Sequence, residues 1–107
     1  MSTIIVKYKA SEDFTGNLEN ELTDKIIEVT STSLDKQPES IIVGYEPWLS
    51  PVPKNAPDLL LRGETSPPRR DKIRGWAEVL LREVKALVDA SLRVAVKTYV
   101  IDSVWIE

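Results

Sequence analysis

The hydrophobic positions of this chain follow a strand, helix, strand pattern that occurs twice. Residues 3–9 are rich in β-branched side chains and predict a first strand. From Asn17, apolar residues recur every three or four positions, which predicts an amphipathic helix. That helix should end before Pro38, because proline disfavours helix in the residue that precedes it. Residues 41–46 predict a second strand.

The second copy has the same organisation and a stronger helical signal. Residues 58–64 predict a third strand. Ser66 followed by Pro67 is typical of a helix start, with proline at the first helical position. Apolar residues at spacings of three and four continue through residues 73–88 and predict the second helix. Residues 93–101 predict the fourth strand, and residues 102–107 are expected to add a short pairing segment.

The element order is therefore βαββαβ within one domain of residues 1–107, as expected for a chain of this length. Pseudo-repeats 1–46 and 58–107 are joined by loop 47–57, which holds four prolines. We expect an α+β fold in which each βαβ unit keeps its strands parallel through a right-handed crossover, with both helices on one face of a four-stranded sheet. A ferredoxin-like sheet, which interleaves the strands antiparallel, is the alternative.

The composition removes several kinds of chemistry. The chain has no Cys and no His, so thiolate or histidine catalysis is excluded, and we expect neither a metal nor a cofactor. A net charge of −3 gives no basis for nucleic-acid binding. No apolar run approaches membrane-spanning length, so we expect no membrane association and a cytoplasmic location.

Two segments resemble a known family. Residues 33–43, SLDKQPESIIV, match a helix that ends in a short link with Pro-Glu-Ser and enters a strand. Residues 91–96, SLRVAV, match the start of the corresponding strand in the second unit. Both segments are similar to the tautomerase superfamily, which includes 4-oxalocrotonate tautomerase and macrophage migration inhibitory factor. The resemblance extends over nearly the whole chain.

The resemblance implies a tautomerase-like fold, a homotrimer, and a pocket at the start of the first strand. The family uses an N-terminal proline as a base, whereas Ser2 stands here. We therefore expect a protein that binds a small keto or enol carboxylic acid with weak or absent isomerase activity. The Ser2 amine would be the base only if Met1 is removed. The alternative function is a non-catalytic oligomeric module that binds a ligand or a partner.

Four cations are candidates for holding a substrate carboxylate. The resemblance places Lys36 and Arg93 at substrate-binding positions. Lys97 lies four residues beyond Arg93 and should face the same side of the strand. Arg62 interrupts an apolar strand and would face either the pocket or a subunit boundary. The alternative for Lys36 is a solvated side chain near a helix end, and the alternative for Arg93 is a strand-edge side chain with a surface partner.

Two further features of the sequence bear on binding and assembly. Arg69, Arg70, Lys72 and Arg74 gather where the second helix is predicted to begin, and they either hold an anion or extend into water. An apolar sheet face that the helices leave uncovered would favour assembly. We expect Trp48, Leu49 and residues 104–106 to make contacts between chains of the trimer.

Overall fold

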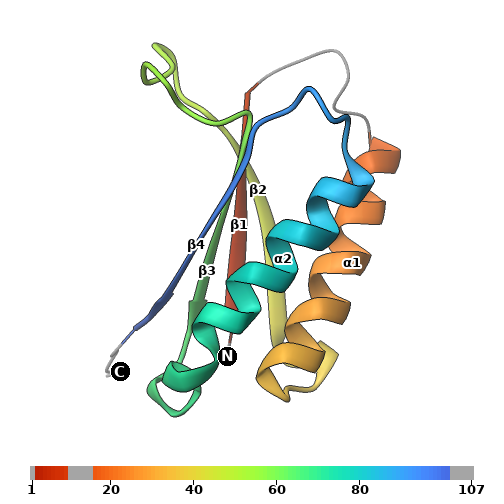
Figure 1. The fold of residues 1–107 in the computed structure, drawn as a ribbon, viewed down its shortest axis with the longest axis vertical. Helices are drawn as coiled ribbons and strands as arrows, with labels where there is room; N and C mark the ends of the chain where they lie inside the picture. Colours follow the sequence, from red (N-terminus) through yellow and green to blue (C-terminus); the bar gives the residue numbers. More distant parts are fainter. Residues whose placement is uncertain (1, 10–15, 102–107) are drawn as a thin grey trace, which may run out of the picture.

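The computed structural model describes residues 2–9 and 16–101 and shows one mixed β-sheet with two long helices packed on the same face (Figure 1). The strands are β1 (Ser2–Tyr8), β2 (Ile41–Pro47), β3 (Leu59–Thr65) and β4 (Val94–Val100). Their order across the sheet is β2-β1-β3-β4. The fold is therefore the predicted α+β arrangement.

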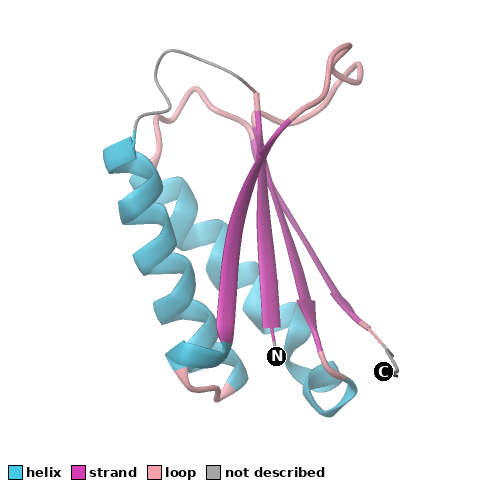
Figure 2. Cartoon of the chain, turned by 180° about the vertical axis from the view of Figure 1, so that it is seen from behind, coloured by secondary structure: helices cyan, strands magenta, loops and turns pink. Residues whose placement is uncertain are grey.

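The strand directions distinguish the two predicted topologies. β1 pairs parallel with β2, and β3 pairs parallel with β4, so each βαβ unit keeps its own strands adjacent. The two units meet along the antiparallel pair of β1 and β3 at the centre of the sheet, as Figure 2 shows from behind. The ferredoxin-like alternative is wrong, because the first strand has a parallel neighbour.

The helices are α1 (Gly16–Leu34) and α2 (Ile73–Leu87). A short 3-10 turn, η1 (Pro38–Ser40), leads from α1 into β2, and a longer one, η2 (Pro67–Lys72), precedes α2. The sequence predicted a regular helix from Pro67, and this detail is wrong. Two successive prolines have no N–H to donate, and the first backbone bond here is the tighter one from Arg69 to Ser66, at 3.0 Å.

The core lies between the sheet and the helices. It is built from alternate strand residues and from one apolar stripe on each helix. The fully buried members include Ile4, Val6, Leu59 and Leu61 from the strands, Leu22 and Ile26 from α1, and Trp76, Leu80 and Val84 from α2. Trp76 is the largest of these, and its indole N–H donates to the Thr30 hydroxyl at 3.0 Å.

Trp76 requires a glycine opposite it. A Cβ built on Gly63 would lie 2.6 Å from the nearest ring atom of Trp76, closer than real Cβ contacts come. Gly63 therefore lets α2 approach β3 with the indole packed against the strand. Because Gly63 lies between two charged residues of β3, this packing also fixes the strand that carries the candidate site.

The other set of alternating strand residues lies on the face without helices. It combines apolar side chains, among them Ile5 and Leu60, with the charged side chains of Lys7, Arg62 and Lys97. Ile42 on this face remains 47% exposed in one chain. None of the helices within residues 2–9 and 16–101 is long and apolar enough to cross a membrane. The expected pairing of residues 102–107 lies outside the described residues.

Candidate functional site: a basic pocket on the helix-free face

Four polar residues form a compact block on β3 and β4. Arg62 is the register partner of Lys97, and Glu64 is the register partner of Tyr99. Members of each register pair lie side by side on the same face, and alternate residues along a strand return to that face. The sheet therefore places two cations, one carboxylate and one phenol within a single patch.

A pocket opens over this block. It has a volume of about 530 Å³ and extends from β4 across β3 to β1 and to the residue that follows β2. Its lining combines cations, aromatic rings and one aliphatic side chain: Lys7, Trp48, Leu60, Arg62, Lys97 and Tyr99. An apolar body with a few convergent charged groups is the usual composition of a small-molecule site.

A chain of hydrogen bonds runs through the Tyr99 hydroxyl. The Arg62 guanidinium donates to the Tyr99 oxygen at 3.1 Å, and the Tyr99 hydroxyl donates to the Glu64 carboxylate at 2.5 Å. The hydrogen bond to Tyr99 is the main cause that raises the pKa of Arg62 above its ordinary value, so this guanidinium stays charged. Tyr99 is thus held between a cation and an anion at the pocket wall.

The aromatic rings carry the other two cations. The ammonium of Lys7 lies 5.0 Å from the centre of the Trp48 ring and 3.9 Å from the Glu46 carboxylate. The ammonium of Lys97 lies 5.9 Å from the centre of the Tyr99 ring. Both distances suit an attraction between a cation and the ring face. Three cations and two nearby carboxylates leave this patch with one excess positive charge, on a protein whose net charge is −3.

The structure brings two of the predicted site residues together, Arg62 and Lys97. Ser2 lies at the end of the sheet where β3 and β4 finish, but its side chain is fully buried on the helix side. There its hydroxyl is hydrogen-bonded to that of Thr65 at 3.0 Å. Lys36 precedes η1 at this same end, since η1 leads directly into the β2 residue opposite Ser2.

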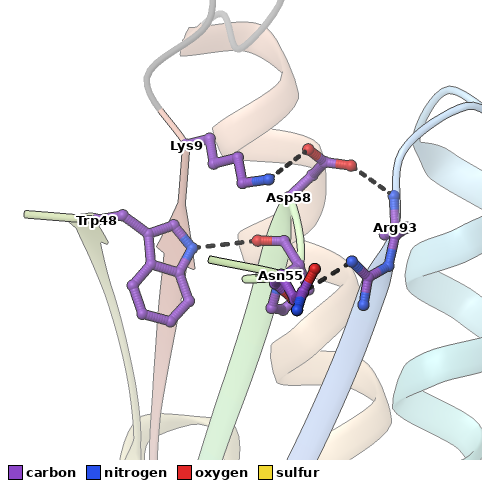
Figure 3. Close-up of polar contacts among 6 residues, drawn as sticks. Lys9, Trp48, Asn55, Asp58 and Arg93 are labelled. Carbon is purple, nitrogen blue, oxygen red and sulfur yellow. Dashed lines mark hydrogen bonds and ion pairs between the residues drawn. The ribbon is translucent and has the colours of Figure 1, made fainter. Parts of the chain in front are cut away.

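Arg93 directly precedes β4, at the end of the sheet opposite Ser2, and lies beside Asp58 and Asn55 (Figure 3). Its backbone N–H donates to the Asp58 carboxylate at 2.7 Å, and its guanidinium donates to the Asn55 carbonyl at 3.3 Å. Six residues of β3 separate this end from the Ser2 end, roughly 20 Å at the usual rise of a strand. Within one chain, Arg93 and Ser2 therefore do not share a site.

Asp58 is the centre of this second cluster. Its carboxylate also faces the ammonium of Lys9 at 3.6 Å. The N–H of Arg93 is the largest cause that lowers the pKa of Asp58, and the charge of Lys9 adds to it. Trp48 closes the same loop from the other side, because its indole donates to the Pro57 carbonyl at 3.2 Å (Figure 3). The cluster fixes loop 47–57 to the sheet.

One member of the basic cluster at residues 69–74 has a structural role. The Arg69 side chain donates to the Leu34 carbonyl at 2.7 Å, at the end of α1. Carbonyls of the last helical turn have no partner within the helix, and a cation is favoured there by the helix dipole. Arg74 forms an ion pair with Glu78 one turn further along α2, at 3.4 Å. An anion site in this cluster stays a prediction.

Sequence analysis did not identify Lys7, Glu64 or Tyr99 as members of a site. The available signal was alternation: Lys7 and Tyr99 occupy strand positions that alternate with apolar core residues, as do Arg62 and Lys97. Parity alone assigns each residue to a face within its own strand. It does not say which residues of different strands are neighbours, which requires the register.

Comparisons with known proteins support the fold. No protein-family model matches the sequence, and no curated protein is similar to it. Among solved structures, a fused 4-OT asymmetric trimer aligns with a TM-score of 0.70 at 15% identity, covering 92% of this chain and 86% of that one. A malonate semialdehyde decarboxylase aligns with a TM-score of 0.70 at 9% identity, covering 92% and 84%. A macrophage migration inhibitory factor-like protein from Entamoeba histolytica gives 0.64 at 10% identity, covering 91% and 85%.

These similarities identify the architecture as the two-unit fold of the tautomerase superfamily. They confirm the fold that the resemblance implied. At these identities they show the fold alone.

Proposed function

We propose that this protein binds a small keto or enol carboxylic acid in the basic pocket on the helix-free face. The observation that carries the proposal is the convergence of Lys7, Arg62 and Lys97 with Trp48 and Leu60 around one hollow. The cations suit a carboxylate, and the ring and aliphatic surfaces suit an apolar body. Because the patch carries one excess positive charge, a ligand with a single carboxylate matches it.

Arg62 is the principal anion holder in this proposal. Its planar guanidinium has five N–H donors and suits the two oxygens of a carboxylate, and only one donor contact goes to Tyr99. Lys97 is its register partner and supplies a second charge beside the same carboxylate. Two like charges directly opposite one another on neighbouring strands repel, and a bound anion offsets this repulsion.

We further propose that any isomerase activity is weak, because the base of the family is not in its usual form. Residue 2 is serine, so removal of Met1 would leave a primary N-terminal amine in place of the secondary amine of proline. Lys36 would then hold an anion near this amine. Arg93 would join such a site only from another chain, given its distance within one chain. Two of the fused 4-OT structures are described as trimers, and we propose a homotrimer here, in which the helix-free face and its pocket lie between chains.

Titration calorimetry with phenylpyruvate tests the binding proposal. Arg62→Gln should weaken binding about ten- to a hundredfold, the effect of losing hydrogen bonds to a charged group. Lys97→Gln should weaken it less, because the ammonium makes no fork-shaped contact. Lys85→Gln on the exposed surface of α2 is the matched control and should bind as the wild type does.

If Arg62→Gln binds as tightly as Lys85→Gln, the pocket is not the binding site. If the wild type binds none of a set of small 2-keto and enol acids, the non-catalytic module that binds a partner replaces this proposal.

A further inference from the structure

Two of the three cations in the pocket are already matched by a carboxylate. The ammonium of Lys7 faces the Glu46 carboxylate at 3.9 Å. The guanidinium of Arg62 is connected to Glu64 through the Tyr99 hydroxyl, which is hydrogen-bonded to both side chains. Both carboxylates of the patch are therefore in use, and these two pairs together carry no net charge.

Lys97 is the third cation, and it carries the excess charge of the patch. Within residues 2–9 and 16–101, no carboxylate forms an ion pair with its ammonium. The ammonium lies instead over the ring of Tyr99, 5.9 Å from the ring centre. Its register partner on the neighbouring strand is Arg62, a second positive charge. In a single chain Lys97 is exposed, so solvent compensates its charge.

The proposed homotrimer takes this solvent away. Its chains meet on the helix-free face, where Ile5, Ile42 and Leu60 supply apolar surface. The core of a protein interface is depleted of charged residues, because an ammonium that leaves water without a partner carries a large free-energy cost. Each of the three chains contributes one such ammonium. Assembly without an anion is therefore unfavourable at three positions.

We propose that the bound carboxylic acid is the counterion of Lys97, and that binding of the acid therefore promotes assembly of the trimer. This inference rests on the proposed function, from which it takes the pocket, the ligand and the homotrimer. A ligand with one carboxylate supplies the single negative charge that the patch lacks. The hollow of about 530 Å³ beside Lys97 has room for it, with Leu60 and Trp48 against its apolar body.

Linkage between binding and assembly gives the size of the effect. A ligand that binds the trimer more tightly than the single chain shifts the equilibrium toward the trimer, whatever the order of the steps. With a preference of about tenfold at each of three sites, a saturating ligand raises the trimerisation constant about 10³-fold. The concentration at which half of the chains are assembled varies as the inverse square root of that constant, so it falls about 30-fold.

Sedimentation velocity over a dilution series measures this concentration with and without saturating phenylpyruvate. The wild type should assemble at an approximately 30-fold lower concentration when the acid is present. The methyl ester of phenylpyruvate has the same apolar body without the charge, and it should leave assembly unchanged. A constant urea concentration below the unfolding transition brings dissociation into range if the trimer persists throughout the series.

Lys97→Met is the sharper test, because its two expected effects have opposite signs. Methionine keeps most of the side-chain volume and removes the charge. Without the acid, this variant should assemble at a concentration at least about tenfold lower than the wild type, since no unpaired ammonium is covered. The acid should bind it more weakly and should shift its assembly much less. Lys85→Met removes a lysine from the exposed surface of α2 and is the matched control, which should behave as the wild type does in both measurements.

Four results would overturn the inference. If Lys97→Met assembles less tightly than the wild type without the acid, a carboxylate of a neighbouring chain holds Lys97 and the ligand does not. If the wild type binds phenylpyruvate in calorimetry but assembles at the same concentration with and without it, the linkage is wrong while the binding function stands. A wild type that binds the acid and stays monomeric contradicts the linkage as well. If the wild type does not bind the acid at all, the proposed function fails first and the linkage fails with it.

Discussion

Replacing Gly63 with alanine is expected to destabilise the fold through one clash. The added Cβ would lie 2.6, 3.0 and 3.1 Å from three ring atoms of Trp76, and this ring is fully buried. The indole cannot swing into solvent, so either the ring or the strand must shift. Overpacking of this kind costs about 1–3 kcal/mol, and the restricted unfolded chain of an alanine variant returns less than about 1 kcal/mol. We expect a net loss of about 1–2 kcal/mol and a fall in melting temperature of roughly 5–10 °C.

Thermal and urea unfolding followed by circular dichroism measure this loss. Gly75→Ala is the matched control, because a Cβ there meets nothing within 4 Å on the exposed side of α2. That variant should gain up to about 1 kcal/mol from helix propensity. In a Trp76→Phe background, which removes the contacting ring atoms, the cost of Gly63→Ala should shrink.

A Gly63→Ala protein as stable as the wild type would refute the reasoning. So would an equal cost in the wild-type and Trp76→Phe backgrounds, since the coupling between the two sites would then be absent.

Three other outcomes are expected. Because the pKa of Asp58 is lowered in the folded protein, its contribution to stability is present above about pH 4 and is lost as the pH falls through the folded-state pKa. In urea unfolding curves measured over a series of pH values, Asp58→Asn should therefore match the wild type only at the acid end. With Met1 removed, Ser2→Pro should raise the rate at which the protein converts phenylenolpyruvate to its ketone, as an ultraviolet assay would show; a folded, correctly processed and unchanged variant would argue against amine chemistry. Light scattering at micromolar concentration should give the mass of three chains, and the mass of one chain would contradict the trimer.

Much of the fold could be predicted because its signals are local. The 3.6-residue period identified both helices, and β-branched runs identified all four strands to within one residue at most ends. The right-handed crossover favoured units that keep their strands adjacent and parallel, and the strand pairing decided against the ferredoxin-like alternative. The 3-10 form of η2 was not predicted, because the pattern of apolar residues does not distinguish the first turns of the two helix types.

The candidate site was predictable only in part. Arg62 and Lys97 were each identified as candidate anion holders, for different reasons. That they are neighbours depends on the register between β3 and β4. Lys7 and Tyr99 gave no signal beyond alternation. Trp48 was expected to make contacts between chains, and within one chain Lys7 and the Pro57 carbonyl already contact it. Its role between chains stays a prediction, and the expected contacts of residues 104–106 lie outside the described residues.

The start of β1 and the residue that follows β4 both contact Thr65 of β3. Thr65 contacts Ser2 through their hydroxyls, and its carbonyl accepts the backbone N–H of Ile101 at 2.9 Å. β1 therefore starts, and β4 finishes, about 10 Å apart, with only β3 between them (Figure 1). A circular permutation that joins these ends by a short linker and opens the chain inside loop 47–57 would exchange the order of the two βαβ units while leaving every strand pairing in place. The sheet therefore depends on the pairing between the two units and does not depend on which unit comes first in the chain.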